Sequence, residues 1–148
     1  MENKKNKTYI SALVIFWITF AFFILNVSSM YGLGYLIGSF IRFIYLPSMV
    51  ILPILGIALI VLAARAKFTK ISKAFFILTG ASALGISVSG LLHNLVFALL
   101  IKLFGEGFLA GMGDEPVFFI LATLVCPIAL LVGVIGSIVF IAKKKVIA

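Results

Sequence analysis

The chain has 148 residues, of which 64% are hydrophobic and 11% are charged, whereas soluble domains average about 45–50% and about 25%. A soluble domain of this length cannot bury so much apolar surface, so we expect an integral membrane protein. The formal net charge of +8 does not indicate nucleic-acid binding, because the basic residues flank apolar runs instead of covering a soluble face with stacking aromatics.

Four apolar runs are long enough to cross the bilayer as helices, since about 20 residues span roughly 30 Å of hydrocarbon. Their composition is Leu, Ile, Val, Phe and Ala without period-2 alternation, which favours helices over a barrel. The predicted fold is therefore an all-α bundle of four transmembrane helices in one domain, residues 1–148. The predicted spans cover residues 8–27, 47–64, 74–101 and 116–142.

The charged residues predict the orientation of these spans. Of the twelve Lys and Arg residues, all but Arg42 and Lys102 fall in three clusters: Lys4, Lys5 and Lys7; Arg65, Lys67, Lys70 and Lys73; Lys143, Lys144 and Lys145. Because short loops rich in Lys and Arg stay cytoplasmic, both termini are predicted inside, with anionic lipid headgroups as partners at that face. Three acids, Glu106, Asp114 and Glu115, lie together in the outer loop before the fourth span. The excess of Lys over Arg suggests a multi-pass protein of a prokaryotic plasma membrane.

The connection between the first and second spans, residues 28–46, has an amphipathic pattern. If this segment forms a helix, its three tyrosines and Arg42 lie on one face and apolar residues lie on the other. We expect a short helix in the membrane interface, with its polar face toward water, followed by a new helix that starts at Pro47. The alternative is a second span that begins near Tyr35, with its cation reaching to the surface. The interfacial residues are Tyr31, Tyr35, Arg42 and Tyr45.

The third and fourth spans each have one face of small residues. Such faces let helices approach closely, and Ser side chains can hydrogen-bond across the contact. We therefore expect a helix, from this chain or from a partner, to pack there, while Gly90 lies on a different side of the third span. Pro127 is expected to kink the fourth span. The predicted helix-packing residues are Ala81, Gly85, Ser89, Gly133 and Ser137.

The same two spans carry the polar residues that could line a pathway. His93 is the only histidine and the only conventional acid–base group within a predicted span. An ionisable residue inside a membrane is a functional candidate because placing it there costs free energy, yet a neutral His can also serve only to hydrogen-bond a neighbour. The candidate ligand or proton pathway comprises Ser82, Ser89, His93, Asn94, Thr123 and Cys126.

No residue constellation specifies a reaction. The spans contain no Asp or Glu, and the chain has one His and one Cys, so no metal site, cofactor site or catalytic site is predicted. The expected function is helix–helix association, as a homo-oligomer or as an accessory subunit of a membrane complex. The alternative is a small transporter or channel component with a pathway lined by the third and fourth spans.

Overall fold

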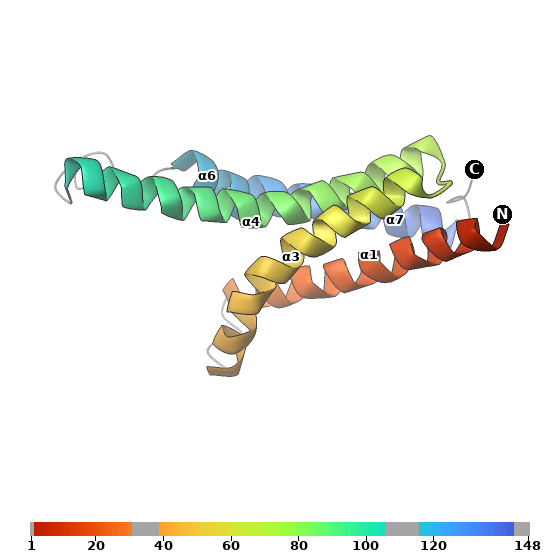
Figure 1. The fold of residues 1–148 in the computed structure, drawn as a ribbon, viewed down its shortest axis with the longest axis horizontal. Helices are drawn as coiled ribbons and strands as arrows, with labels where there is room; N and C mark the ends of the chain where they lie inside the picture. Colours follow the sequence, from red (N-terminus) through yellow and green to blue (C-terminus); the bar gives the residue numbers. More distant parts are fainter. Residues whose placement is uncertain (1, 31–38, 106–115, 144–148) are drawn as a thin grey trace.

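The computed structural model describes residues 2–30, 39–105 and 116–143, and these ranges contain helices and no strand (Figure 1). A π-helix, η1, interrupts the last helix of the chain, so that α6, η1 and α7 follow one another directly. The elements are α1 (Glu2–Met30), α3 (Ser39–Arg65), α4 (Lys70–Phe104), α6 (Pro116–Ile120), η1 (Leu121–Val125) and α7 (Cys126–Ala142).

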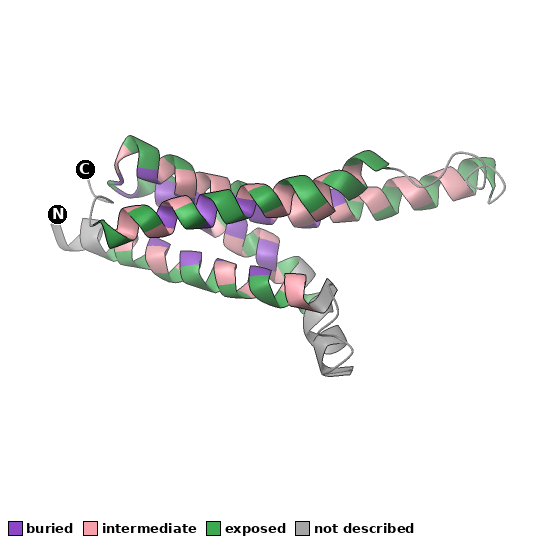
Figure 2. Ribbon diagram, turned by 180° about the vertical axis from the view of Figure 1, so that it is seen from behind, coloured by how far each residue is buried: buried purple, intermediate pink, exposed green. Residues whose placement is uncertain are grey.

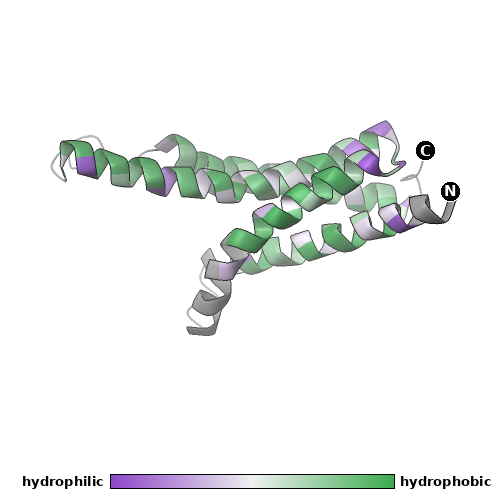
Figure 3. Ribbon diagram, viewed as in Figure 1, coloured by the Kyte–Doolittle hydropathy of each residue, from purple (hydrophilic) through white to green (hydrophobic). Residues whose placement is uncertain are grey.

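Three of the helical segments are long and apolar enough to cross a membrane, namely Lys7–Ser28, Lys70–Phe104 and Pro116–Ala142. In α3 the apolar stretch found among the described residues, Val50–Arg65, is shorter. Large hydrophobic side chains are exposed on every one of these segments, and Figure 3 shows that hydrophobic residues predominate along these helices. The chain therefore has the surface of a helical integral membrane protein in contact with lipid.

The helices differ from the predicted spans mainly at their ends. Helix α4 begins at Lys70, four residues before the predicted start, because Thr69 caps it by accepting a hydrogen bond from the Ser72 backbone N–H at 3.3 Å. Its 35 residues extend about 52 Å at 1.5 Å per residue, well beyond roughly 30 Å of hydrocarbon. This helix must therefore tilt or project past the bilayer.

The predicted start of a new helix at Pro47 is wrong. Helix α3 begins at Ser39 and continues through Pro47 and Pro53. Proline removes a backbone hydrogen bond, but transmembrane helices tolerate it where neighbouring groups satisfy the freed carbonyl. Two of the predicted interfacial residues, Arg42 and Tyr45, consequently belong to α3. The other two, Tyr31 and Tyr35, lie outside the described residues, and the ends of the predicted interfacial segment belong to α1 and α3.

Helix α4 occupies the centre of the arrangement, with α3 on one side and α7 on another, while α1 packs mainly against α3. The start of α1, the α3–α4 connection and the end of α7 lie together at one end (Figure 1). This end is named the basic end, because its exposed cations are Lys7, Arg65, Lys67, Lys70 and Lys143. Toward the opposite end, the α1–α3 pair and the α4–α7 pair diverge (Figures 1 and 2).

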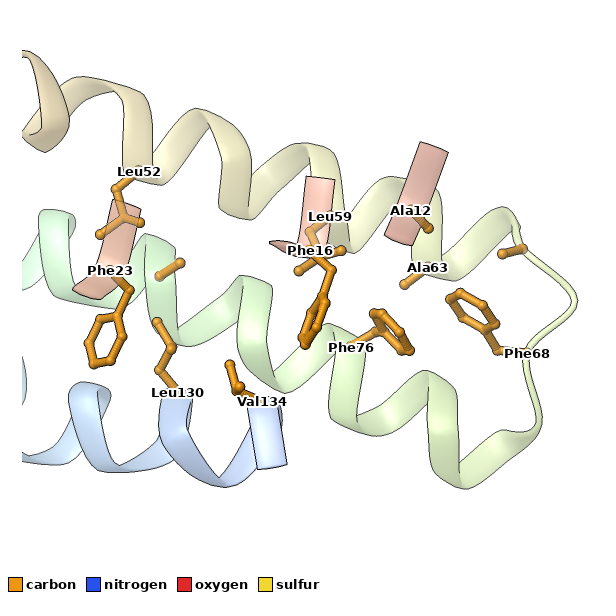
Figure 4. Close-up of a cluster of buried hydrophobic side chains, with 12 residues drawn as sticks. Ala12, Phe16, Phe23, Leu52, Leu59, Ala63, Phe68, Phe76, Leu130 and Val134 are labelled. Carbon is orange, nitrogen blue, oxygen red and sulfur yellow. The ribbon is translucent and has the colours of Figure 1, made fainter. Parts of the chain in front are cut away.

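The hydrophobic core lies in the half of the bundle where the two pairs remain together. Figure 4 shows the Phe76 ring between Phe68 and Phe16, with ring-centroid distances of 4.6 Å to Phe68 and 5.1 Å to Phe16. The α3–α4 connection is held by the Lys73 ammonium, which donates to the Ala64 carbonyl at 2.9 Å. The buried hydrophobic residues are Ala12, Phe16, Phe23, Leu52, Leu59, Ala63, Ala66, Phe68, Phe76, Ala83, Leu130 and Val134.

Candidate functional site

The small faces of the third and fourth predicted spans meet each other within the chain. A Cβ atom built on Gly85 would lie 2.8 Å from the Cys126 Sγ atom. One built on Gly133 would lie 2.6 Å from the Thr79 Oγ1 atom and 2.8 Å from the Thr79 backbone nitrogen. Since these distances are shorter than van der Waals contact, glycine is what lets α4 and α7 approach so closely. We call this contact the α4–α7 seam.

The other predicted packing residues are distributed unevenly around α4 and α7. Ser89 and Ser137 are buried, and Ser137 follows Gly133 by one turn on α7. Ala81 is exposed, which places it on the side of α4 away from its neighbours. Gly136, which was not among the predicted residues, lies directly against the Phe75 ring. The seam is therefore a tightly packed internal contact along most of its length.

The last span is interrupted where Pro127 perturbs its hydrogen bonding. Proline has no N–H to offer the carbonyl four residues earlier, and its ring crowds that carbonyl. Directly before it, Leu121–Val125 form the π-helix η1, and the Cys126 backbone N–H donates to the Leu121 carbonyl, five residues back. The helix therefore has one wider turn shortly before Pro127, and π-bulges of this kind occur frequently at functional sites.

His93 lies on the far part of the seam from the basic end, among aromatic rings. Its imidazole is 5.4 Å from the Phe119 ring of α6 and 6.5 Å from the Phe97 ring of its own helix, measured between ring centroids. His93 is half-buried. The only histidine of the chain therefore contributes to packing between α4 and α6.

The candidate pathway residues do not form one continuous polar set. Ser82 and Ser89 are buried, whereas Asn94 is exposed and its Nδ2 atom donates to the Gly90 carbonyl at 2.9 Å. The Thr123 hydroxyl donates to the Phe119 carbonyl of its own helix turn at 2.7 Å. A Thr hydroxyl that bonds to the preceding turn is satisfied locally, whereas the single bond of Asn94 uses only one N–H of its amide.

A second surface on α4 escaped the sequence analysis. The side of α4 that packs on α3 carries Gly80 and Ala83, and at 100° per residue it continues through Ser87, Gly90 and Asn94. A Cβ built on Gly90 would meet nothing within 4 Å, in contrast to Gly80, because α3 diverges from α4 at this level (Figure 1). Ser87 is still buried, so we name Gly90, Asn94 and Ala98 the open face of α4.

The signal for both surfaces was present in the sequence as glycines inside apolar runs. Glycine destabilises a helix interior by roughly 0.5–1 kcal/mol relative to alanine, so it is retained where another group must come close. Gly56 and Gly80 belong to such a contact between α3 and α4, since a Cβ on Gly56 would lie 2.5 Å from the Gly80 carbonyl oxygen. A glycine in the sequence, however, indicates only that some group comes close, and it does not identify the helix that makes the contact.

Within residues 2–30, 39–105 and 116–143, no three His, Cys, Asp or Glu side chains come together in a way that would hold a metal ion. Comparison of the chain with known protein families, curated proteins and solved structures finds no match. Any function must therefore be inferred from the helices and the surfaces that they leave uncovered.

Proposed function

We propose that the protein acts through helix–helix association in the membrane, as a homo-oligomer or as an accessory subunit of a membrane complex. The proposal includes four spans, with α3 as the second, and both termini on the cytoplasmic side of a prokaryotic plasma membrane. The basic end would then face the cytoplasm, in contact with anionic lipid headgroups.

The exposed amide of Asn94 is the observation that supports this proposal. A polar side chain on a membrane-spanning helix is costly next to lipid and is commonly found bonded to a neighbouring helix. The bond from Asn94 Nδ2 to the Gly90 carbonyl uses one N–H of the amide, whose second N–H and carbonyl oxygen can bond elsewhere. The open face of α4 therefore has the chemistry that a further transmembrane helix recognises.

The small residues beside Asn94 support the same reading. Nothing lies within 4 Å of the position that a Gly90 Cβ would occupy, and Ser87 is one turn nearer the core. A helix entering between the diverging pairs would approach the α4 backbone at Gly90, much as α3 approaches it at Gly80. Close approach of this kind strengthens van der Waals packing, which drives helix association in lipid.

The test is to isolate the protein from native membranes and to measure its oligomer or a stoichiometric partner. Gly90→Leu and Asn94→Leu should each reduce that association, because Leu blocks close approach and cannot form the amide's hydrogen bonds. Ala81→Leu is the matched control, since Ala81 is exposed on the opposite side of α4. Association that survives both open-face variants but is lost in Ala81→Leu would place the contact on the other side of the helix.

A transport pathway between α4 and α7 is the alternative function. It would require the seam to separate, because the contacts of Gly85 with Cys126 and of Gly133 with Thr79 leave no room for a solute. Flux in reconstituted vesicles, lost on Ser89→Leu but unaffected by Gly90→Leu, would support transport over association.

A further inference from the structure

Asn94 lies at the middle of the open face of α4, with a small residue one turn away on either side. Gly90, Asn94 and Ala98 are spaced four residues apart, so they follow one another along one side of the helix. A Cβ on Gly90 would meet nothing within 4 Å, and both Asn94 and Ala98 are exposed. Small residues at this spacing are typical of transmembrane helices that pair closely and cross at about 40°.

The Asn94 amide is complementary to a second amide of the same kind. One of its N–H groups donates to the Gly90 carbonyl at 2.9 Å, which leaves one N–H donor and the carbonyl oxygen for other groups. Two such amides placed face to face can exchange a pair of hydrogen bonds, with the free N–H of each donating to the oxygen of the other. Neither amide would then expose an unbonded N–H to lipid.

Membrane orientation brings the same residue of two copies together. Two copies of the chain in one membrane have the same orientation, because the same basic clusters orient both. Their α4 helices are therefore parallel, and a two-fold axis along the membrane normal places a residue of the contact opposite its own copy. Such a contact must be self-complementary. A single Asn in an otherwise apolar contact is also the residue that fixes register in parallel helix pairs.

Helices that cross at Asn94 leave room for α3. Gly80, where α3 packs on α4, precedes Asn94 by about 21 Å of helix at 1.5 Å per residue. Two helices crossing at about 40° are displaced sideways by about 14 Å at that level. Since packed helices lie about 8–10 Å apart, α3 of each copy can stay on its own α4. The divergence of α3 from α4 opens the space beside Asn94 (Figures 1 and 2).

We propose that two copies of the chain form a parallel, two-fold symmetric dimer through their open faces, with the two Asn94 amides hydrogen-bonded to each other across the axis. This dimer rests on the proposed function, and it identifies the partner helix as α4 of a second copy. A hydroxyl on a different helix is a poorer match. If it bonds to its own preceding turn, as Thr123 does in this chain, it can accept from Asn94 but cannot donate to it.

Disulfide cross-linking tests whether Asn94 lies opposite its own copy. The Cys126→Ala background removes the only cysteine of the chain. In this background the full-length variant Asn94→Cys is oxidised in native membranes with copper phenanthroline. A disulfide requires Cα atoms within about 7 Å, so Asn94→Cys should form a covalent dimer. Leu99→Cys is the matched control and should remain monomeric, because Leu99 is exposed at a similar depth but on another side of α4.

Energy transfer between copies labelled at their amino termini measures the contribution of the hydrogen bonds. In vesicles, Asn94→Leu should weaken dimerisation by about three- to tenfold, the range expected for interhelical hydrogen bonds in membranes. Asn94→Gln should retain most of the association, because it carries the same amide. Leu99→Ala should have little effect, since Leu99 is outside the proposed contact.

Several outcomes separate this dimer from the proposed function. Failure of Asn94→Cys to cross-link would overturn the dimer even if energy transfer shows associated copies, because they would then meet through another surface. Equal cross-linking of Leu99→Cys would overturn it as random collision. A monomeric chain that binds a different protein, and loses it in Asn94→Leu, would overturn the dimer and retain the proposed function. A monomer without any partner would overturn both.

Discussion

Gly56 of α3 and Gly80 of α4 lie so close together that neither position has room for a side chain. A Cβ on Gly56 would lie 2.5 Å from the Gly80 carbonyl oxygen, and a Cβ on Gly80 would lie 2.7 Å from the Gly56 carbonyl oxygen. Because both obstacles are backbone atoms, no side-chain rotation can relieve them. This pair therefore sets how closely the α1–α3 pair approaches the α4–α7 pair, just before the two diverge.

Replacing Gly80 with Ala should destabilise the fold even though Ala has the higher helix propensity. Its methyl group would meet the Gly56 carbonyl and Ile60, so the two helices must move apart, and overpacking of this kind costs about 1–3 kcal/mol. Thermal unfolding in detergent, followed by circular dichroism, measures the change. Gly90→Ala is the control and should leave the melting temperature unchanged or raise it, since nothing lies within 4 Å there. Equal loss in both variants would contradict the contact.

Gly85 and Cys126 should be energetically coupled. A Cβ on Gly85 would be 2.8 Å from the Cys126 Sγ atom but 3.8 Å from its Cβ atom, so only the sulfur obstructs a methyl group. We expect Gly85→Ala to destabilise the native protein and Cys126→Ala to restore most of that loss. A double-mutant cycle should give a coupling of about 0.5–3 kcal/mol. Additive effects of the two substitutions would mean that the seam is looser than described.

Phe76 should be among the most costly core positions to truncate. It is fully buried and contacts the rings of Phe68 and Phe16. Phe76→Ala should lower the free energy of unfolding by about 3–5 kcal/mol, through lost contacts and the cavity left behind. Ile71→Ala, on the same helix but 61% exposed, should cost far less. Chemical denaturation in detergent distinguishes the two, and similar midpoints would place Phe76 outside the stabilising core.

The orientation can be checked by cysteine labelling in intact cells. In a Cys126→Ala background, a cysteine at Lys67 should resist a membrane-impermeant reagent, whereas one at Leu103 should react. Lys67 is exposed at the basic end, and Leu103 is exposed near the far end of α4, so both side chains are accessible if they reach water. Labelling at Lys67 but not at Leu103 would invert the proposed topology.

The helices themselves were predictable, because the length and apolarity of a run decide locally whether it can span a membrane. The segment Pro116–Ala142 coincides with the predicted fourth span, and the π-helix η1 lies shortly before Pro127, where a kink was predicted. The helix start at Pro47 was predicted wrongly, since proline is compatible both with a first turn and with the interior of a membrane helix. Local sequence does not distinguish these two positions.

The sequence by itself determined that the chain forms apolar helices, where its cations cluster, and the angle of each small residue around its own helix. Only the tertiary structure decided which neighbouring helix, if any, packs against each side of a given helix. Gly85 and Gly90 illustrate the difference: both are small residues on α4, but Gly85 faces Cys126 within the chain and Gly90 faces nothing within 4 Å. The physical reason is that helical periodicity is a local property, whereas the divergence of α3 from α4 depends on contacts between residues as distant as Gly56 and Gly80.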